Sequence, residues 1–144
     1  MNILIVDGQG GGIGKTLVAR LSPLAEECGF EITAVGTNSI ASLAMKKAGA
    51  KYSATGENAV AVNAANADII AGSIGIIAGN SMMGELSPKM AQAISQSRAV
   101  KILIPFNRCN LRIMGVGEGS MSAMIDEAVN EMLSLIKDNK KDGL

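Results

Sequence analysis

The chain has 144 residues, and its 13 basic and 13 acidic side chains give a formal net charge of zero. This balance offers no electrostatic attraction to nucleic acid or to an anionic membrane surface, and an aromatic content of 2% leaves no platform for stacking bases. Histidine is absent, which excludes Ser-His-Asp and Cys-His catalysis and histidine-ligated zinc. We therefore expect no bound metal and no nucleic-acid or membrane partner.

The length and the hydrophobic content of 48% predict one domain with its own core. We expect this domain to span residues 1–138 and a polar tail to follow at 139–144. The longest apolar stretch, 69–78, is too short to cross a bilayer and contains two glycines. Because no charged leader precedes the first apolar run, we expect a cytoplasmic protein.

Apolar runs alternate with segments of helical periodicity along the chain, and Gly29 and Gly49 follow two of the helical segments. We expect strands at 2–6, 31–35, 52–54, 69–72 and 100–104, and helices at 13–28, 41–48, 57–67, 88–97 and 121–136. Segment 74–78 either continues its strand or forms another, and 111–116 is a candidate last strand. The alternation predicts a three-layer Rossmann-like α/β fold, with a mostly parallel sheet of about five strands and helices on both faces.

The strongest chemical signal is a glycine-rich segment that follows the first strand and opens the first helix. A helix N-terminus presents unpaired N–H groups and a partial positive charge, and glycines let a phosphate approach them closely. The dinucleotide pattern GxGxxG fails because its third glycine falls at Ile13, and GxxxxGK[ST] fails because its first falls at Gln9. The predicted phosphate-binding residues are Gly8, Gln9, Gly10, Gly11, Gly12, Ile13, Gly14 and Lys15.

The end of the second strand bears on the choice of cofactor. Dinucleotide-binding folds that use NAD place an acidic residue here, but this strand ends in Thr37, Asn38 and Ser39. The missing carboxylate and the charge of Lys15 favour a ribose 2′-phosphate, and therefore NADP over NAD. Asn38 also fits a role as the cap of the next helix, which is compatible with ligand binding.

Other candidates follow later strands, because ligands of open α/β sheets bind at the carboxyl ends of the strands. Ser73 follows the fourth predicted strand, segment 79–85 follows 74–78 if that segment is a strand, and Asn107 and Arg108 follow the fifth predicted strand. A guanidinium at Arg108 is suited to a bidentate contact with phosphate or carboxylate. Cys109 is a candidate nucleophile if Arg108 lowers its pKa, and a polar turn is the alternative interpretation.

The spacing Gly8-x-x-x-Gly12-Ile13-Gly14 resembles the nucleotide-binding turn of the short-chain dehydrogenase/reductase family over about the first 36 residues. The resemblance implies a dinucleotide pyrophosphate over the helix start, with Lys15 near an added phosphate. The family's Tyr-x-x-x-Lys is absent, since Gly56 stands at that offset from Tyr52. The whole chain also resembles an uncharacterised family of short bacterial proteins, which shares residues 7–14 and 107–110 and implies no activity.

These observations predict a small-molecule nucleotide-binding protein, with NADP as the expected ligand. One alternative is a small oxidoreductase whose site is completed across a homodimer, to which the apolar stripe of the last helix would contribute. The other is a P-loop-like ATP-binding protein. That alternative needs a Mg²⁺ carboxylate after a strand, whereas Asp68 precedes its strand.

Overall fold

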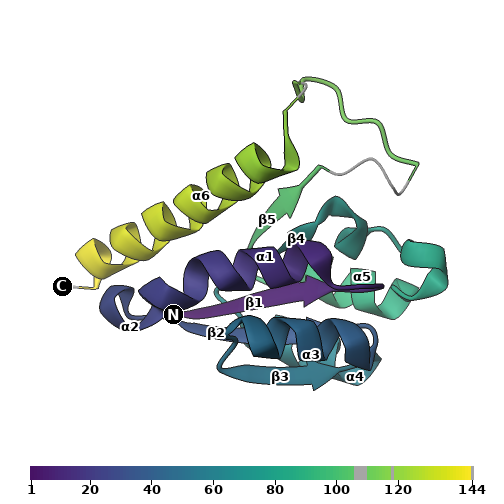
Figure 1. The fold of residues 1–144 in the computed structure, drawn as a ribbon, viewed down its shortest axis with the longest axis horizontal. Coiled ribbons are helices and arrows are strands. Elements are labelled where there is room, and N and C mark those ends of the chain that lie inside the picture. The colour runs from purple at the N-terminus through teal and green to yellow at the C-terminus, as the bar shows by residue number, and fades with distance from the viewer. Residues whose placement is uncertain (106–109, 118, 144) are drawn as a thin grey trace.

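The computed structural model describes residues 1–105, 110–117 and 119–143, and its centre is a parallel β-sheet (Figure 1). The sheet has five strands in the order β3-β2-β1-β4-β5. The connection from β3 to β4 therefore passes across β2 and β1. This is the Rossmann strand order 3-2-1-4-5-6 without its sixth strand, and its switch point lies between β1 and β4. The strands are β1 (Asn2–Asp7), β2 (Glu31–Gly36), β3 (Tyr52–Thr55), β4 (Ile69–Ser73) and β5 (Val100–Ile104).

In the described part of the chain, six α-helices cover the two faces of this sheet and confirm the expected three layers. On one face lie α1, α2, α3 and α6, and on the other lie α4 and α5. The helices are α1 (Gly12–Leu21), α2 (Ala25–Cys28), α3 (Ser39–Ala48), α4 (Glu57–Asn66), α5 (Pro88–Gln96) and α6 (Met121–Asp142). No described helix is both long and apolar enough to span a membrane.

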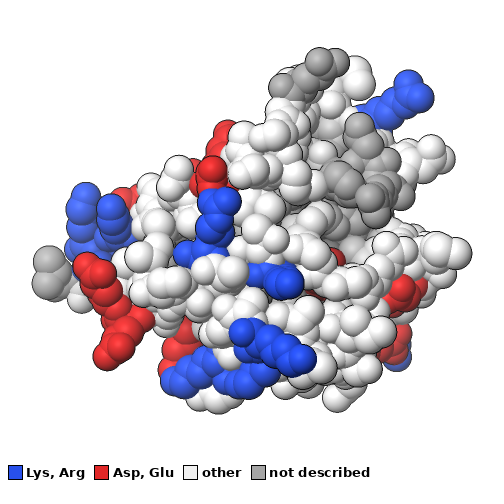
Figure 2. Space-filling view, viewed as in Figure 1, with Lys and Arg blue, Asp and Glu red and all other residues white. Residues whose placement is uncertain are grey.

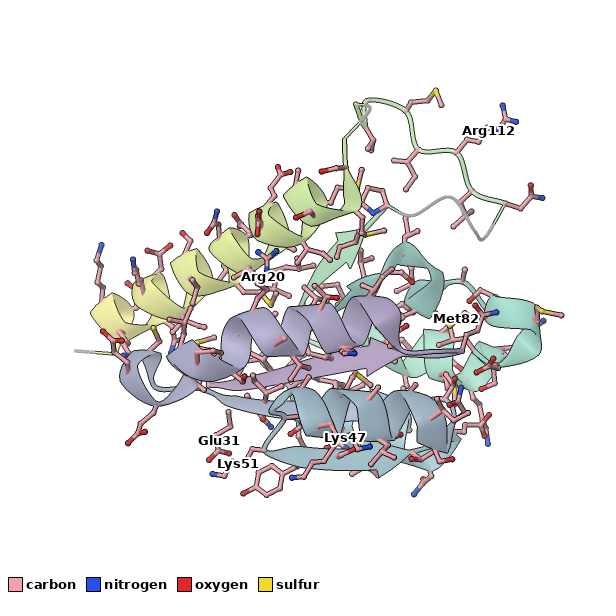
Figure 3. All side chains as sticks on the ribbon, in the orientation of Figure 1. Arg20, Glu31, Lys47, Lys51, Met82 and Arg112 are labelled. Atoms are coloured by element: carbon pink, nitrogen blue, oxygen red, sulfur yellow. The ribbon has the colours of Figure 1, made fainter. Side chains whose placement is uncertain are left out.

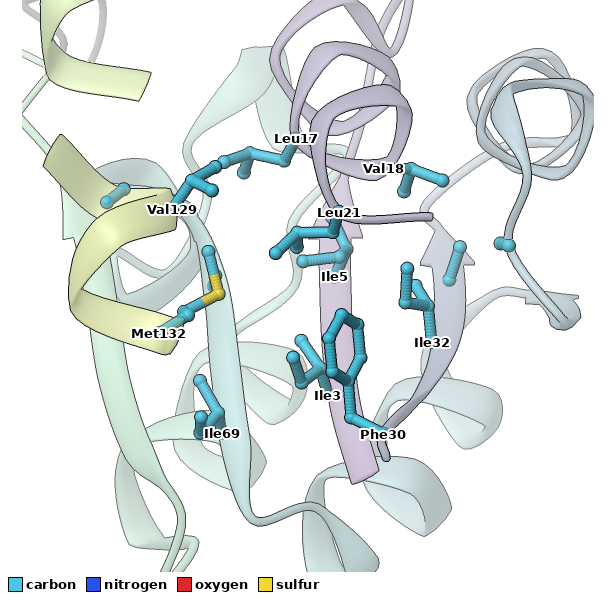
Figure 4. Close-up of a cluster of buried hydrophobic side chains, with 14 of the residues drawn as sticks. Ile3, Ile5, Leu17, Val18, Leu21, Phe30, Ile32, Ile69, Val129 and Met132 are labelled. Carbon is cyan, nitrogen blue, oxygen red and sulfur yellow. The ribbon is translucent and has the colours of Figure 1, made fainter. Parts of the chain in front are cut away.

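The core is split by the sheet because successive residues of β1 point to opposite faces. Ile3 and Ile5 belong to the cluster under α1 and α6, whereas Leu4 and Val6 belong to the cluster under α4 and α5. Figure 4 shows the first of these clusters, in which side chains of α1 and α6 converge over β1 and β4. Burial on both faces explains why β1 is aliphatic without alternation.

The segment expected as one helix over 13–28 is broken near its middle. α1 ends at Leu21, a 3-10 turn η1 occupies Ser22–Leu24, and the short α2 follows. Pro23 stands in that turn, where it lacks the N–H that a continuous α-helix would require. Gly29 ends α2 in a left-handed conformation with φ 73°, as the sequence predicted.

Three further segments differ from expectation. Ile74–Ile77 forms a 3-10 turn, η2, rather than a strand, and residues 110–117 contain no strand. α6 runs through the segment expected as a polar tail to Asp142, with Lys140 and Lys141 in its last turn, where the helix dipole favours cations. The apolar stripe of α6 is buried against the sheet and α1, so it does not offer the dimer surface that the sequence suggested.

Candidate functional site

The loop between β1 and α1 lies at the carboxyl edge of the sheet, where the sequence predicted a phosphate site. The N–H of Gly11 donates to the carbonyl oxygen of Gly8 at 2.9 Å, which closes a tight turn. Gly11 has φ 71° and forms the N-cap of α1, a left-handed position that glycine adopts without strain. Lys15 then donates its N–H to the carbonyl of Gly11 at 2.8 Å, so α-helical bonding starts at that residue.

Asp7, at the end of β1, anchors this loop to the sheet through hydrogen bonds. Its two carboxylate oxygens accept hydrogen bonds from the N–H of Gly8 at 2.8 Å and from the N–H of Gly14 at 2.6 Å. The side chain is buried, and desolvation raises the pKa of its carboxyl group against the opposing effect of the two N–H donors. The sequence analysis did not name Asp7 as a site residue. An acidic residue at the end of a buried strand was the feature that could have identified it.

Three of the five loop glycines are required by packing. A Cβ at Gly8 would lie 2.6 Å from Oγ1 of Thr37, and one at Gly14 would lie 2.8 Å from Cβ of Asp7. At Gly11 a Cβ would meet the main chain of α3 at 2.9 Å. By contrast, a Cβ at Gly10 or Gly12 would stand in open space, and neither residue has a left-handed φ. The fold therefore does not explain why these two positions are glycine.

The start of α1 also presents unused hydrogen-bond donors. Among the described residues, no acceptor is bonded to the main-chain N–H groups of Gly10, Gly12 and Ile13. The first turn of α1 contains no acidic residue, and it carries the exposed Lys15 instead. Acids are the residues that a helix dipole favours at this end, so the electrostatics of this turn suit an external anion.

The end of β2 meets the glycine loop directly. The N–H of Thr37 donates to the carbonyl of Asp7 at 2.9 Å, and Nδ2 of Asn38 donates to the carbonyl of Gln9 at 2.9 Å. Oδ1 of Asn38 accepts from Ala41 at 2.9 Å, so Asn38 is the cap of α3, and Ser39 is the first residue of that helix. The structure thus brings together the two sequence-predicted groups of residues, the glycine loop and the end of β2.

A carboxylate from a distant segment completes this edge. Oε1 of Glu85 accepts from the N–H of Gln9 at 2.9 Å, from Oγ1 of Thr37 at 2.8 Å and from Nδ2 of Asn38 at 2.6 Å. These donors, the Gln9 N–H foremost, lower the pKa of Glu85 and keep it ionised at neutral pH. The sequence analysis gave Glu85 no role of its own, because Glu85 lies 48 residues beyond Thr37 in a segment, 79–85, that was a candidate only if 74–78 formed a strand.

The loop that carries Glu85 is packed on the glycine loop. It contains a second 3-10 turn, η3 (Met82–Gly84), between η2 and α5. Figure 3 shows Met82 beyond the carboxyl end of β1, and a Cβ at Gly8 would lie 2.6 Å from its sulfur. Asn80, Met82 and Met83 all have positive φ, between 56° and 68°, so this loop has a demanding backbone conformation.

The remaining predicted residues are placed as follows. Ser73 is buried at the carboxyl end of β4, beside β1, on the same edge as the glycine loop. Asn107, Arg108 and Cys109 lie outside the described residues. Asp68 lies at the opposite edge, where its Oδ2 accepts from the N–H of Asn2 at 2.7 Å, so it is remote from the start of α1. Asp68 therefore gives no support to the ATP-binding alternative.

Charged side chains elsewhere form a mixed surface. In Figure 2 several Lys and Arg side chains gather over α3 and β3, and Lys46, Lys47 and Lys51 belong to this region.

Two hollows lie away from the glycine loop. Lys51 forms an ion pair with Glu31 (Figure 3), and beside this pair lies a hollow of about 770 Å³ at the amino edge of the sheet. Another hollow of about 650 Å³ lies between β5, α6 and the segment before α6. Both are separate from the glycine loop.

Comparison with solved structures gives a match to a dodecameric FMN-dependent Ubix-like decarboxylase from Escherichia coli O157:H7, known from a crystal structure. The two chains are 16% identical, the match covers 94% of each, and the TM-score is 0.41. No curated protein matches the chain.

The expectation of NADP was wrong. The matched decarboxylase is described as FMN-dependent. The physical basis of the expectation also fails, because it rested on the absence of a carboxylate at the end of β2. Glu85 supplies that carboxylate, and its negative charge beside Thr37 and Asn38 would repel a 2′-phosphate.

A family model described as "Domain of unknown function (DUF3842)" matches residues 2–137. This confirms the resemblance to an uncharacterised family, whereas the resemblance of the glycine turn to short-chain dehydrogenases stays a prediction. The match spans nearly the whole chain, including the glycine loop, Glu85 and all five strands. The chain therefore belongs to the family described as Domain of unknown function (DUF3842).

Proposed function

We propose that this protein binds a phosphate-bearing nucleotide, with a phosphate on the main-chain N–H groups at the start of α1. One observation carries the proposal: Gly10, Gly12 and Ile13 present N–H groups that no described residue accepts, on a helix start that faces the carboxyl edge of the sheet. Main-chain N–H groups at such an edge, together with the helix dipole, form the usual phosphate site of nucleotide-binding α/β folds.

The two glycines in open space support this assignment. Gly10 and Gly12 are not needed for a left-handed turn or for close packing against the protein, in contrast to Gly8, Gly11 and Gly14. Glycine at an open helix start lowers the stability of the fold, because glycine loses more conformational entropy on folding than other residues and no packing contact here offsets that loss. Close approach of a ligand to the main chain is the physical reason for glycine that remains.

The negative charge at the glycine loop lies on the side of the sheet, and the positive charge lies on the side of the solvent, where an anion would bind. Asp7 takes up the N–H groups of Gly8 and Gly14 from the side of the sheet, and Lys15 lies exposed one turn into α1. Lys15 forms no ion pair with a described acidic residue. Its ammonium group is therefore available to a phosphate, as a mobile point charge beside the fixed N–H groups.

The experiment is a thermal-shift screen with AMP, ADP, ATP, GTP, NAD and FMN, followed by calorimetric titration of every ligand that raises the melting temperature. We expect Lys15→Glu to weaken binding by about tenfold or more, equivalent to about 1.4 kcal/mol, without loss of the fold. Lys89→Glu is the matched control, because Lys89 is also exposed in the first turn of a helix, α5. Both substitutions place an acid where the helix dipole favours it.

Gly12→Ala tests the main-chain contact itself. The added methyl group has open space in the free protein, so the fold should be unaffected, but it would stand against a ligand on the loop. We expect weaker nucleotide binding, while the melting temperature of the free protein stays the same or rises slightly, because alanine restricts the unfolded chain. If no phosphate-bearing nucleotide in the panel binds, or if both Lys15→Glu and Gly12→Ala bind as the unchanged protein does, the proposal is wrong.

A further inference from the structure

The structure supplies a group that the sequence of β2 lacks. Nucleotide-binding folds of this topology fix the ribose hydroxyls with an acidic side chain at the end of β2. Here β2 ends at Gly36, and the residues that follow are Thr37, Asn38 and Ser39. The carboxylate of Glu85 reaches the same place from the loop between β4 and α5, where it bonds to Thr37 and Asn38.

The carboxylate of Glu85 is held in a fixed orientation with one oxygen free. All three of its hydrogen bonds are made by Oε1, to Gln9, Thr37 and Asn38. No described residue donates to Oε2. Three donors on one oxygen leave that oxygen no capacity for a ligand, while a free oxygen on the same oriented group is an acceptor-only site. Hydroxyl groups are among the donors that such an oxygen accepts.

The free oxygen is also close to the proposed phosphate site. Oε1 is bonded to the N–H of Gln9, and the next N–H along the chain, that of Gly10, is the first of the unused donors of the loop. An acceptor for hydroxyls therefore stands beside donors for a phosphate. Ribose hydroxyls and a 5′-linked phosphate have this same adjacency in a nucleotide.

We infer that Glu85 binds the 2′- and 3′-hydroxyls of the ribose, and that the ligand is a nucleotide with an unsubstituted ribose. This inference rests on the proposed phosphate site. An ionised acceptor gains a charge-assisted hydrogen bond from each hydroxyl, whereas a 2′-phosphate would be repelled and a 2′-deoxyribose would lose one bond. Glu85 therefore acts as a residue that determines specificity.

Glu85→Gln is a sharp test because it changes one oxygen. The amide oxygen of the new side chain can accept from the donors that Oε1 now engages, so the loop stays anchored, while its NH₂ group replaces the free acceptor. Glu57→Gln is the matched control, since Glu57 is exposed and accepts one hydrogen bond, from Oγ of Ser87, in the neighbouring part of the same edge. Thermal denaturation of both variants checks that they are folded.

Each protein is titrated by calorimetry with ADP, with 2′-deoxy-ADP and with adenosine 2′,5′-bisphosphate. For the unchanged protein we expect ADP to bind about tenfold or more tightly than 2′-deoxy-ADP, and the bisphosphate to bind weakly. Glu85→Gln should remove the preference for ADP over 2′-deoxy-ADP, and Glu57→Gln should retain it. This loss of discrimination is a readout that a merely structural role of Glu85 would not produce.

The outcomes separate the two proposals. If ADP binds and Lys15→Glu weakens it, but Glu85→Gln leaves the preference for ADP unchanged, the phosphate site stands and the role of Glu85 is refuted. If Glu85→Gln binds ADP more tightly, Glu85 competes with the ligand for the N–H of Gln9, and the inference is again refuted. If none of the three probes binds to the unchanged protein, the ribose contact is refuted, whereas the phosphate site is refuted only if the other nucleotides of the thermal-shift panel fail to bind as well.

Discussion

The N–H of Gly14 donates to Oδ2 of Asp7 at 2.6 Å, so the last residue of β1 caps the third residue of α1. The residue in the N-cap position, Gly11, has no side chain that could do so. The other oxygen of Asp7 binds the N–H of Gly8, which fixes both ends of the loop to one carboxylate. A strand side chain thereby ties the start of α1 to the end of β1.

Replacement of Asp7 by alanine should destabilise the fold. Asp7→Ala leaves the buried N–H groups of Gly8 and Gly14 without acceptors, which typically costs about 1–3 kcal/mol. Asp7→Asn keeps one acceptor and removes the buried charge, so we expect a smaller loss. Urea denaturation measures both. Equal stability of Asp7→Ala and the unchanged protein would show that the cap contributes nothing.

Gly14→Ala and Gly12→Ala should differ in stability although both add one methyl group to the first turn of α1. The Cβ at position 14 would lie 2.6 Å from the sulfur of Met45 and 2.8 Å from Cβ of Asp7, and such overpacking costs about 1–3 kcal/mol. At position 12 the space is open. The denaturant midpoint should therefore fall for Gly14→Ala alone. A Gly12→Ala protein as unstable as Gly14→Ala would contradict the assignment of open space.

Met83→Gly should stabilise the loop that carries Glu85. Met83 has φ 57° and ψ 32°, and its side chain is 96% exposed, so little packing is lost on substitution. A left-handed residue with a Cβ costs about 1–2 kcal/mol, of which part is offset by the greater freedom of glycine in the unfolded chain. We expect a net gain of roughly 0.5–1 kcal/mol in a thermal or urea melt. Met83→Ala retains the Cβ and should show no such gain.

The contribution of Glu85 to stability should depend on pH. The hydrogen bonds that Glu85 accepts lower its pKa below the ordinary value of 4.5. The stabilisation from Glu85 is therefore complete above pH 4.5 and is lost as the pH falls through the lowered pKa. Burial raises the pKa of Asp7, so that group has the opposite sign and favours the folded state in acid. Comparison of Glu85→Gln with the unchanged protein isolates Glu85. Their difference in unfolding free energy should shrink between about pH 5 and pH 3, and a constant difference would argue against the assignment.

Much of the fold could be predicted from the sequence, because buried apolar residues recur along the chain with the period of the strand or helix that contains them. Each strand of the sheet overlaps a segment predicted as a strand, and caps such as Asn38 and Ser87 mark the helix starts. The break in the first helix was missed because apolar spacing continues across Pro23, whose missing N–H outweighs that spacing. Segment 74–78 was misread because a short apolar run does not distinguish a strand from a buried turn.

The site was predictable only where its residues are close in sequence. The glycine loop and the end of β2 were found because each directly follows a strand, and parallel strands bring their carboxyl ends to one edge. Glu85 was given no role because segment 79–85 was a candidate only if 74–78 formed a strand, and the chain forms the 3-10 turns η2 and η3 there instead. Its absence from the prediction led directly to the wrong choice of NADP.

The place of β1 in the sheet has a consequence for synthesis on the ribosome. β1 is the first strand to emerge, yet it lies in the middle of the sheet and pairs with both β2 and β4. The nascent chain can assemble β1, β2 and β3 early, while the other side of β1 waits for residues 69–73. During that interval the glycine loop would lack the hydrogen bonds that Glu85 makes to Gln9, Thr37 and Asn38, so this edge of the sheet is completed only after residue 85 has been synthesised.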